Sequence, residues 1–102
     1  MLTILFYMTG KPGADAQLEA LVREMVDESR AHDGCVTYTF HRQADDAREW
    51  MLIEEWRDKA ALNGHVERMK ARFGEPPPGA RLPARLDALT ESSRFAFYQA
   101  LS

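Results

Sequence analysis

Apolar residues recur with the spacing of strands and helices over most of the chain. Leu2 to Thr9 is rich in β-branched and aromatic residues and ends at a Gly-Lys-Pro-Gly turn, which predicts a first strand. From Ala14 to His32, apolar residues return every three or four positions, which predicts a helix with one buried stripe. Gly34 follows as a residue that can adopt the left-handed conformation and end this helix.

The middle of the chain predicts a hairpin and then a second helix. Cys35 to Gln43 alternates in polarity, which puts Val36 on the same side as the aromatic residues of this strand. Arg48 to Trp56 is the partner strand, and the pair is antiparallel because the connecting turn is short. Asp58 is a natural N-cap for a helix from about Lys59 to Phe73.

The last part of the chain is less regular. Gly74 to Gly79 contains three prolines and cannot continue the second helix. Leu82 to Leu89 predicts a short helix, and Arg94 to Leu101 predicts a final strand with Phe95 and Phe97 on one face. The element order, β-α-β-β-α-(α)-β, is typical of the α+β class and of the ferredoxin-like split βαβ arrangement, a four-stranded antiparallel sheet with helices on one face.

A sheet with helices on one face leaves its second face open. We expect this open face to carry Phe6, Tyr38, Trp50 and Trp56, which all lie at strand positions. An aromatic surface of that size is rarely left in water. Packing two sheets face to face would bury it, which predicts a homodimer.

Composition narrows the class of protein. The 102 residues correspond to one domain, and the net charge of -3, with no basic run, argues against a nucleic-acid partner. The single cysteine, Cys35, excludes an intramolecular disulfide and favours a reducing compartment. No segment resembles a signal peptide or a membrane span, so we expect a cytoplasmic protein. The three histidines lack metal-ligand spacing and no glycine-rich phosphate loop is present, so no metal or nucleotide cofactor is predicted.

The candidate chemistry lies near the second helix. His65 is the best candidate base because the unperturbed pKa of histidine is near neutrality, although it can equally pack against the sheet without reacting. Glu54 must be paired or hydrogen-bonded if its strand face is covered. It can orient His65 or bind a substrate hydroxyl, or it can form a structural pair with Arg42 or another basic group. His32 is explained by the dipole at the end of the first helix.

Two aromatic residues are candidates for ligand contact, each with a structural alternative. Tyr38 can donate its hydroxyl to a ligand oxygen or simply pack between its neighbours. Trp56 can stack on an aromatic ligand or belong to the core or a dimer interface. His41 points to the opposite side of its strand from Tyr38 and is expected to be solvated.

Three segments, in this order and spacing, resemble those of one family. Lys11-Pro12-Gly13 precedes the first helix, His32 to Tyr38 reads HDGCVTY, and Leu52 to His65 is similar to the pattern ExWxdxxALxxH. Together they resemble the antibiotic biosynthesis monooxygenase domain of the dimeric α/β-barrel superfamily over residues 1–73. The resemblance implies a homodimer whose sheets form a barrel, with a pocket between the sheet and the helices of each protomer.

The same resemblance implies a class of reaction and leaves alternatives. Such proteins include oxygenases that act on quinols or phenols with molecular oxygen and without metal or flavin, which would make His65 the base and place Tyr38, Glu54 and Trp56 around a small aromatic substrate. Lys70 stands where many members carry a second histidine. A non-catalytic dimer that binds a small ligand and an isomerase of a keto or phosphorylated metabolite therefore remain open. Haem degradation is not expected, because the first strand lacks the asparagine of haem-degrading members.

Overall fold

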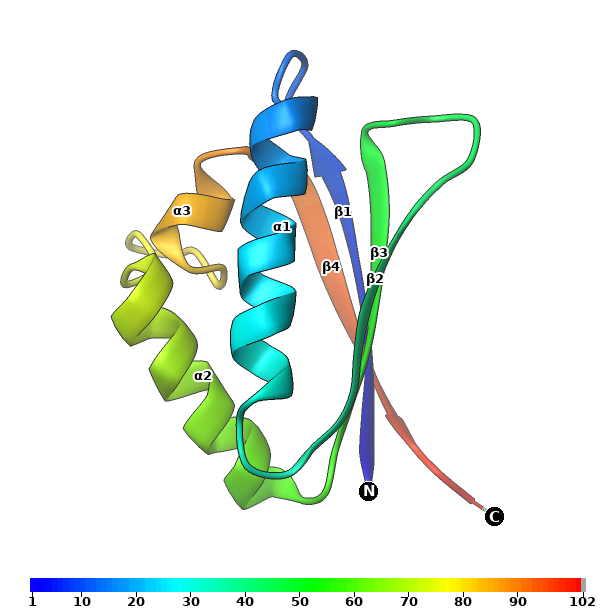
Figure 1. Cartoon of the computed structure of the whole chain (residues 1–102), viewed down its shortest axis with the longest axis vertical. Helices are drawn as coiled ribbons and strands as arrows, with labels where there is room; N and C mark the ends of the chain where they lie inside the picture. Colours follow the sequence, from blue (N-terminus) through cyan, green and yellow to red (C-terminus); the bar gives the residue numbers. More distant parts are fainter. Residues whose placement is uncertain (102) are drawn as a thin grey trace.

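A computed structural model describes residues 1–101 and shows the predicted order of strands and helices. The elements are β1 (Leu2–Gly10), α1 (Asp15–Arg30), β2 (Cys35–Arg42), β3 (Glu49–Trp56), α2 (Lys59–Phe73), α3 (Ala84–Asp87) and β4 (Thr90–Gln99). The four strands form one antiparallel sheet in the order β2-β3-β1-β4, and α1 and α2 lie on one side of it (Figure 1). The predicted α+β, ferredoxin-like fold is confirmed. None of the helices in the described part of the chain is long and apolar enough to cross a membrane.

Residues that favour helix termini mark the start of α2 and follow the end of α1. The Asp58 side chain accepts a hydrogen bond of 2.9 Å from the Ala61 backbone N–H, as an N-cap does. Helix α1 ends at Arg30, two residues before the predicted end, and Gly34 then has a φ of +82°. Because His32 lies beyond the last helical turn, its side chain can turn towards α2.

The C-terminal elements differ from their predicted bounds. Strand β4 begins at Thr90, four residues before the predicted start, and ends at Gln99, before Leu101. Its first residues are polar and exposed on a sheet edge, so the pairing with β1, and not an apolar pattern, makes them a strand. Helix α3 is a single turn from Ala84 to Asp87 and is shorter than predicted.

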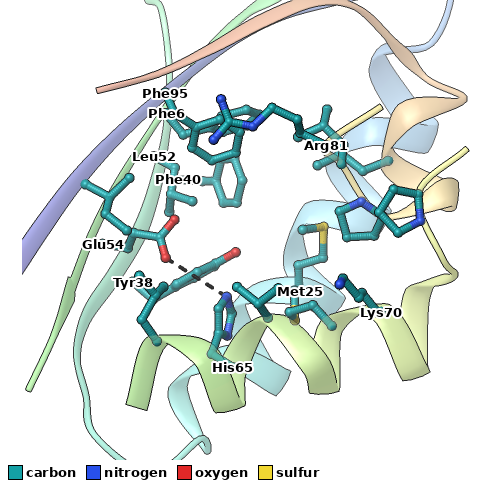
Figure 2. A pocket seen from close by; sticks show the side chains of 18 of the residues that line it. Phe6, Met25, Tyr38, Phe40, Leu52, Glu54, His65, Lys70, Arg81 and Phe95 are labelled. Atoms are coloured by element: carbon teal, nitrogen blue, oxygen red, sulfur yellow. Dashed lines mark ion pairs between the residues drawn. The ribbon is translucent and has the colours of Figure 1, made fainter. Parts of the chain in front are cut away.

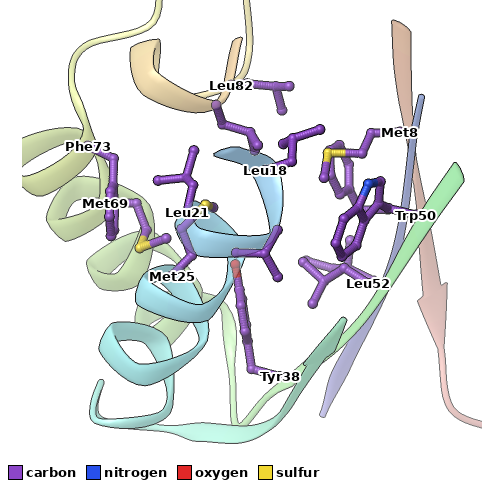
Figure 3. Packing of buried hydrophobic residues seen from close by; sticks show 14 of the residues in the cluster. Met8, Leu18, Leu21, Met25, Tyr38, Trp50, Leu52, Met69, Phe73 and Leu82 are labelled. Carbon is purple, nitrogen blue, oxygen red and sulfur yellow. The ribbon is translucent and has the colours of Figure 1, made fainter. Parts of the chain in front are cut away.

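The prediction that the large aromatic residues lie on the open face of the sheet is wrong. Phe6, Tyr38, Trp50 and Trp56 are 6% exposed or less, and they lie under the helices on the inner face. Figure 3 shows the core that results, in which residues of α1 stand between the sheet and α2. The open face instead carries a mixture of half-buried apolar and polar side chains, among them Thr3, Leu5, Tyr7, Met51, Ile53 and Glu55.

A β-bulge interrupts the predicted alternation of β2. The register with β3 shifts between Cys35 and Thr37, so Val36 is the extra residue and is 55% exposed. Alternation alone predicted that Val36 shares a face with Tyr38, and the bulge shows that this prediction is wrong. After the bulge, the pairing places Tyr38 directly opposite Glu54 on the inner face.

Candidate functional site

A cavity of about 400 Å³ lies between the inner face of the sheet, α2 and the segment that leads into α3. Its walls are mainly apolar and aromatic, and they include Phe6, Phe40, Leu52, Met69, Leu86, Phe95 and Phe97. A few polar side chains project into it: Tyr38, Glu54, His65, Lys70 and Arg81 (Figure 2). The volume and the mostly apolar lining are typical of a site for a small organic molecule.

Glu54 reaches the cavity from β3 and is only 5% exposed. The Trp56 indole N–H donates a 2.7 Å hydrogen bond to Glu54 Oε1, and the same oxygen lies 4.0 Å from His65 Nε2. Burial raises the pKa of Glu54 to about 7, although the bond from Trp56 acts in the opposite direction. The carboxyl group can therefore exchange a proton near neutral pH.

Arg42 does not pair with Glu54, so the predicted pair between these two residues is wrong. The Arg42 guanidinium donates a 3.0 Å hydrogen bond to Glu19 and lies over the Trp50 ring at 4.2 Å from its centroid. These contacts hold it at the other end of the strand pair, since Arg42 pairs with Trp50 in the register of β2 and β3. Glu54 is left with an indole and an imidazole as its nearest polar neighbours.

Trp56 lies behind the polar groups of the cavity. Its side chain is fully buried, and its ring centroid is 4.3 Å from that of His65. The indole thus packs on one side of the imidazole while its N–H holds Glu54. In this position Trp56 supports the two titratable groups and does not line the cavity.

Tyr38 brings a neutral hydroxyl to the cavity. The side chain is 3% exposed, and its ring centroid lies 5.5 Å from that of His65. Burial, and secondly the nearby Glu54 carboxylate, raise the pKa of Tyr38 above its ordinary value. Tyr38 therefore remains a phenol, which can donate a hydrogen bond to an oxygen atom of a ligand.

His65 is buried on α2 and is joined to a second histidine. Its Nδ1 lies 2.9 Å from Nδ1 of His32, and Nε2 of His32 lies 2.8 Å from a carboxylate oxygen of Glu28. The prediction that the helix dipole alone explains His32 is wrong, because the His32 ring is buried between these two partners. The spacing of four residues between Glu28 and His32 was the available sequence signal.

The hydrogen bonds decide which nitrogen of His65 can accept a proton. Glu28 as a carboxylate only accepts hydrogen bonds, so Nε2 of His32 carries a proton and Nδ1 of a neutral His32 is the acceptor. Nδ1 of His65 is then the donor, which leaves a lone pair on Nε2. Burial, and next the proximity of His32 and Arg68, lower the pKa of His65 to about 3. The imidazole is therefore neutral, and beside a neutral His32 its free lone pair lies on Nε2, on the side of Glu54.

Two cationic side chains complete the lining. Lys70 projects from α2 opposite Glu54 in Figure 2, and the Arg81 guanidinium lies 4.9 Å from the centroid of the Phe95 ring. His41, by contrast, is exposed, as predicted. Among residues 1–101, no group of three or more His, Cys, Asp or Glu side chains is placed to hold a metal ion.

Comparison with known proteins places this site in a family. The family model described as antibiotic biosynthesis monooxygenase matches residues 1–72. The chain belongs to the antibiotic biosynthesis monooxygenase family. Four of the five polar residues of the cavity lie within the matched part, and only Arg81 lies beyond it. The polar part of the site is therefore largely built from the segment that the family model matches.

Individual proteins of known sequence or structure are also similar to this chain. The chain is 38% identical over 55 residues to "Putative monooxygenase Rv0793" of Mycobacterium tuberculosis, which is 54% of each chain. The crystal structure of PA3566 from Pseudomonas aeruginosa is 30% identical, with a TM-score of 0.78 over 99% of this chain and 94% of that one. SnoaB of Streptomyces nogalater, described as a cofactor-independent oxygenase, shares the fold at 20% identity, with a TM-score of 0.72 over 99% and 93%. The chain spans about half, or less, of the length of the curated relatives it matches first.

Proposed function

We propose that this protein is a monooxygenase that uses molecular oxygen to oxidise a small aromatic quinol or polyphenol, without metal or flavin. The observation that carries this proposal is the buried His65 imidazole, with Nε2 4.0 Å from Glu54, at the wall of an aromatic-lined cavity of about 400 Å³. The family supports the reaction class, and the description of SnoaB supports the cofactor-independent form of it.

In the proposed reaction His65 acts as the base. Its Nε2 takes the proton of a substrate hydroxyl, which makes the ring electron-rich enough to react with oxygen. Tyr38 donates a hydrogen bond to a substrate oxygen, and Glu54 exchanges a proton because its pKa is about 7. The apolar walls hold the aromatic ring and keep water away from the reactive intermediate.

The reaction balances without an external reductant. A substrate that loses two hydrogen atoms and gains one oxygen atom is oxidised by four electrons, and the oxygen molecule accepts all four. One of its oxygen atoms enters the product, and the other leaves as water with the two hydrogen atoms. The protein therefore needs to supply proton transfer, orientation and a dry cavity.

Oxygen uptake with a panel of hydroquinones tests the proposal. We expect consumption by the wild-type protein and a loss of about 100-fold or more in kcat for His65→Ala, which is the usual scale of general-base catalysis. His41→Ala is the matched control, because His41 is exposed on the other side of β2. No uptake by the wild-type protein, or equal uptake by His65→Ala, would contradict the proposal.

The cations in the cavity favour a second candidate. Lys70 and Arg81 can bind a phosphate or carboxylate group, as an isomerase of a keto or phosphorylated metabolite requires. Conversion of such compounds with no oxygen uptake would support this candidate. Thermal stabilisation by an aromatic ligand with neither reaction would instead indicate a non-catalytic binding protein.

We also propose that two copies associate through the open face of the sheet, as the family resemblance implies. This face carries the half-buried apolar side chains Leu5, Tyr7, Met51 and Ile53 on its two central strands. The exposed Tyr98 of β4 extends the same surface. The helices and the cavity lie on the opposite side of the sheet, so this association would leave each cavity intact.

A further inference from the structure

The histidine pair connects the cavity with the protein surface. His65 is 5% exposed and His32 is 6% exposed, whereas the Glu28 side chain is 27% exposed. The two contacts that link them, 2.9 Å and 2.8 Å, are hydrogen-bond distances. A continuous chain of three titratable groups therefore runs from the cavity wall to the outside of α1.

We propose that Glu28, His32 and His65 form a proton relay that places the positive charge gained from the substrate proton outside the cavity. This inference rests on the proposed function for the origin of the proton, but the relay itself follows from the hydrogen bonds. His65 is the catalytic residue, since it faces the substrate. Glu28 and His32 are positioning residues that act through it.

Each step of the relay moves one proton. His65 Nε2 binds the substrate proton, and the proton on His65 Nδ1 passes to Nδ1 of His32. His65 is again neutral, now with its proton on Nε2, and the positive charge lies on His32 beside the Glu28 carboxylate. The reverse steps return the proton when the second oxygen atom leaves as water, so no net proton is gained or lost.

The relay solves a problem of charge burial. A protonated His65 would carry its charge in an apolar cavity with Arg68 nearby, and both conditions disfavour a cation there. The relay moves that charge from His65 to the neighbouring ring of His32. There the partly exposed Glu28 carboxylate accepts a hydrogen bond from His32. The cavity can then remove a proton while the positive charge rests on a buried ring that is paired with a carboxylate.

Other charged groups also surround the pair and set its response to pH. Arg72 on α2 forms an ion pair with the second oxygen of Glu28 at 3.3 Å, and Arg68 lies on the same helix near His65. Further titratable groups on this side of the sheet include Glu54 on β3, Cys35 and Tyr38 on β2, Arg30 on α1 and Lys70 on α2. A variant that tests the outer end of the relay must therefore change Glu28 alone, because a change of Arg72 would also alter the charge beside Glu28.

Nitrogen NMR of the histidine rings in the substrate-free protein tests the relay without any assay of activity. At neutral pH we expect His65 to carry its proton on Nδ1. On acidification, one added proton should appear on His65 Nε2 while His32 becomes charged, with one midpoint for both rings. A His65 protonated on Nε2 at neutral pH, or two rings that titrate independently, would overturn the relay.

A matched pair of α1 variants tests the outer end of the relay. Glu28→Gln keeps a hydrogen-bond acceptor but removes the charge, so the common midpoint should move to lower pH by half a unit or more. Glu24→Gln is the control, because Glu24 lies one turn away and also contacts Arg72, at 3.9 Å, without touching His32. Equal midpoints in the two variants would contradict the role of Glu28.

Kinetics separate the relay from a structural role of His32. His32→Asn can still accept a hydrogen bond from His65 but cannot store a proton, so we expect kcat for quinol oxidation to fall about 10-fold or more and the pH profile to change. Full activity with an unchanged profile would show that His32 only orients His65 and would overturn the relay. Absence of oxygen uptake by the wild-type protein would reject the proposed function, and the NMR titration would still decide the relay.

Discussion

Among single residues, Glu54 links the stability of the protein to pH. Its pKa is about 7 in the folded protein against 4.5 ordinarily, so between these values the folded state binds more protons than the unfolded state. Its contribution to stability is therefore present below pH 4.5 and is lost as the pH rises to 7. At about 1.4 kcal/mol per pKa unit, the difference of about 2.5 units corresponds to a loss of about 3.5 kcal/mol above pH 7.

Glu54→Gln tests this linkage because glutamine keeps an oxygen that can accept the Trp56 hydrogen bond. We expect the variant to be more stable than wild type by about 3 kcal/mol at pH 8 and nearly equal to it at pH 4, in urea unfolding. His65 contributes with the opposite sign between pH 3 and 6.5, but this contribution is common to both proteins. A stability difference that does not depend on pH would contradict the burial of this carboxylate.

The sequence predicts the identity of the cavity residues better than their partners. The family resemblance implied a pocket with Glu54, Tyr38 and His65, and all three line one cavity, although the expected open face would have put the two strand residues on the side away from His65. The pairing of His65 with His32 was not predictable in the same way, because it depends on how closely the end of α1 approaches α2. The position of Trp56 behind the cavity was not predictable either, since alternation indicates the face on which a side chain lies but not how deeply it is buried.

At the level of elements, the turn after α1 holds both the fold and the site. Gly34 has a φ of +82°, and a methyl group added there would run into the Ala61 side chain at the start of α2. We expect Gly34→Ala to cost about 2–4 kcal/mol, the sum of the left-handed conformation and of overpacking. Urea unfolding measures this loss, and the displaced turn should also weaken the hydrogen bond between His32 and His65.

Gly79→Ala is the matched control for this turn. Gly79 has a similar φ of +80°, but no atom lies within 4 Å of the added methyl group. Only the conformational cost remains, so we expect a loss of about 1 kcal/mol. Equal losses for the two variants would show that the contact between Gly34 and α2 contributes nothing.

The elements themselves were predicted almost completely, and the errors have physical causes. The order and the bounds of β1 to α2 follow from periodicity and from terminal residues such as Asp58 and Gly34. The prediction of which face of the sheet the helices cover was wrong, because alternation separates the two faces of a strand without indicating which one is covered. Large residues such as Trp50 and Phe6 lie under the helices because the helices offer the deepest burial. The start of β4 was missed because edge pairing gives no apolar pattern.

At the scale of the whole molecule, Ile53 is the residue that best tests the proposed dimer. It lies on β3, opposite Leu5 of β1, near the middle of the open face. We expect Ile53→Arg to convert a two-chain particle into a single chain in light scattering, because two arginines would meet in an apolar contact. Ala71→Arg adds the same charge on the exposed side of α2 and should leave the mass unchanged. A wild-type protein that is already a single chain would contradict the dimer. Because Ile53 points away from the cavity, oxygen uptake by the Ile53→Arg single chain would show whether each site works alone.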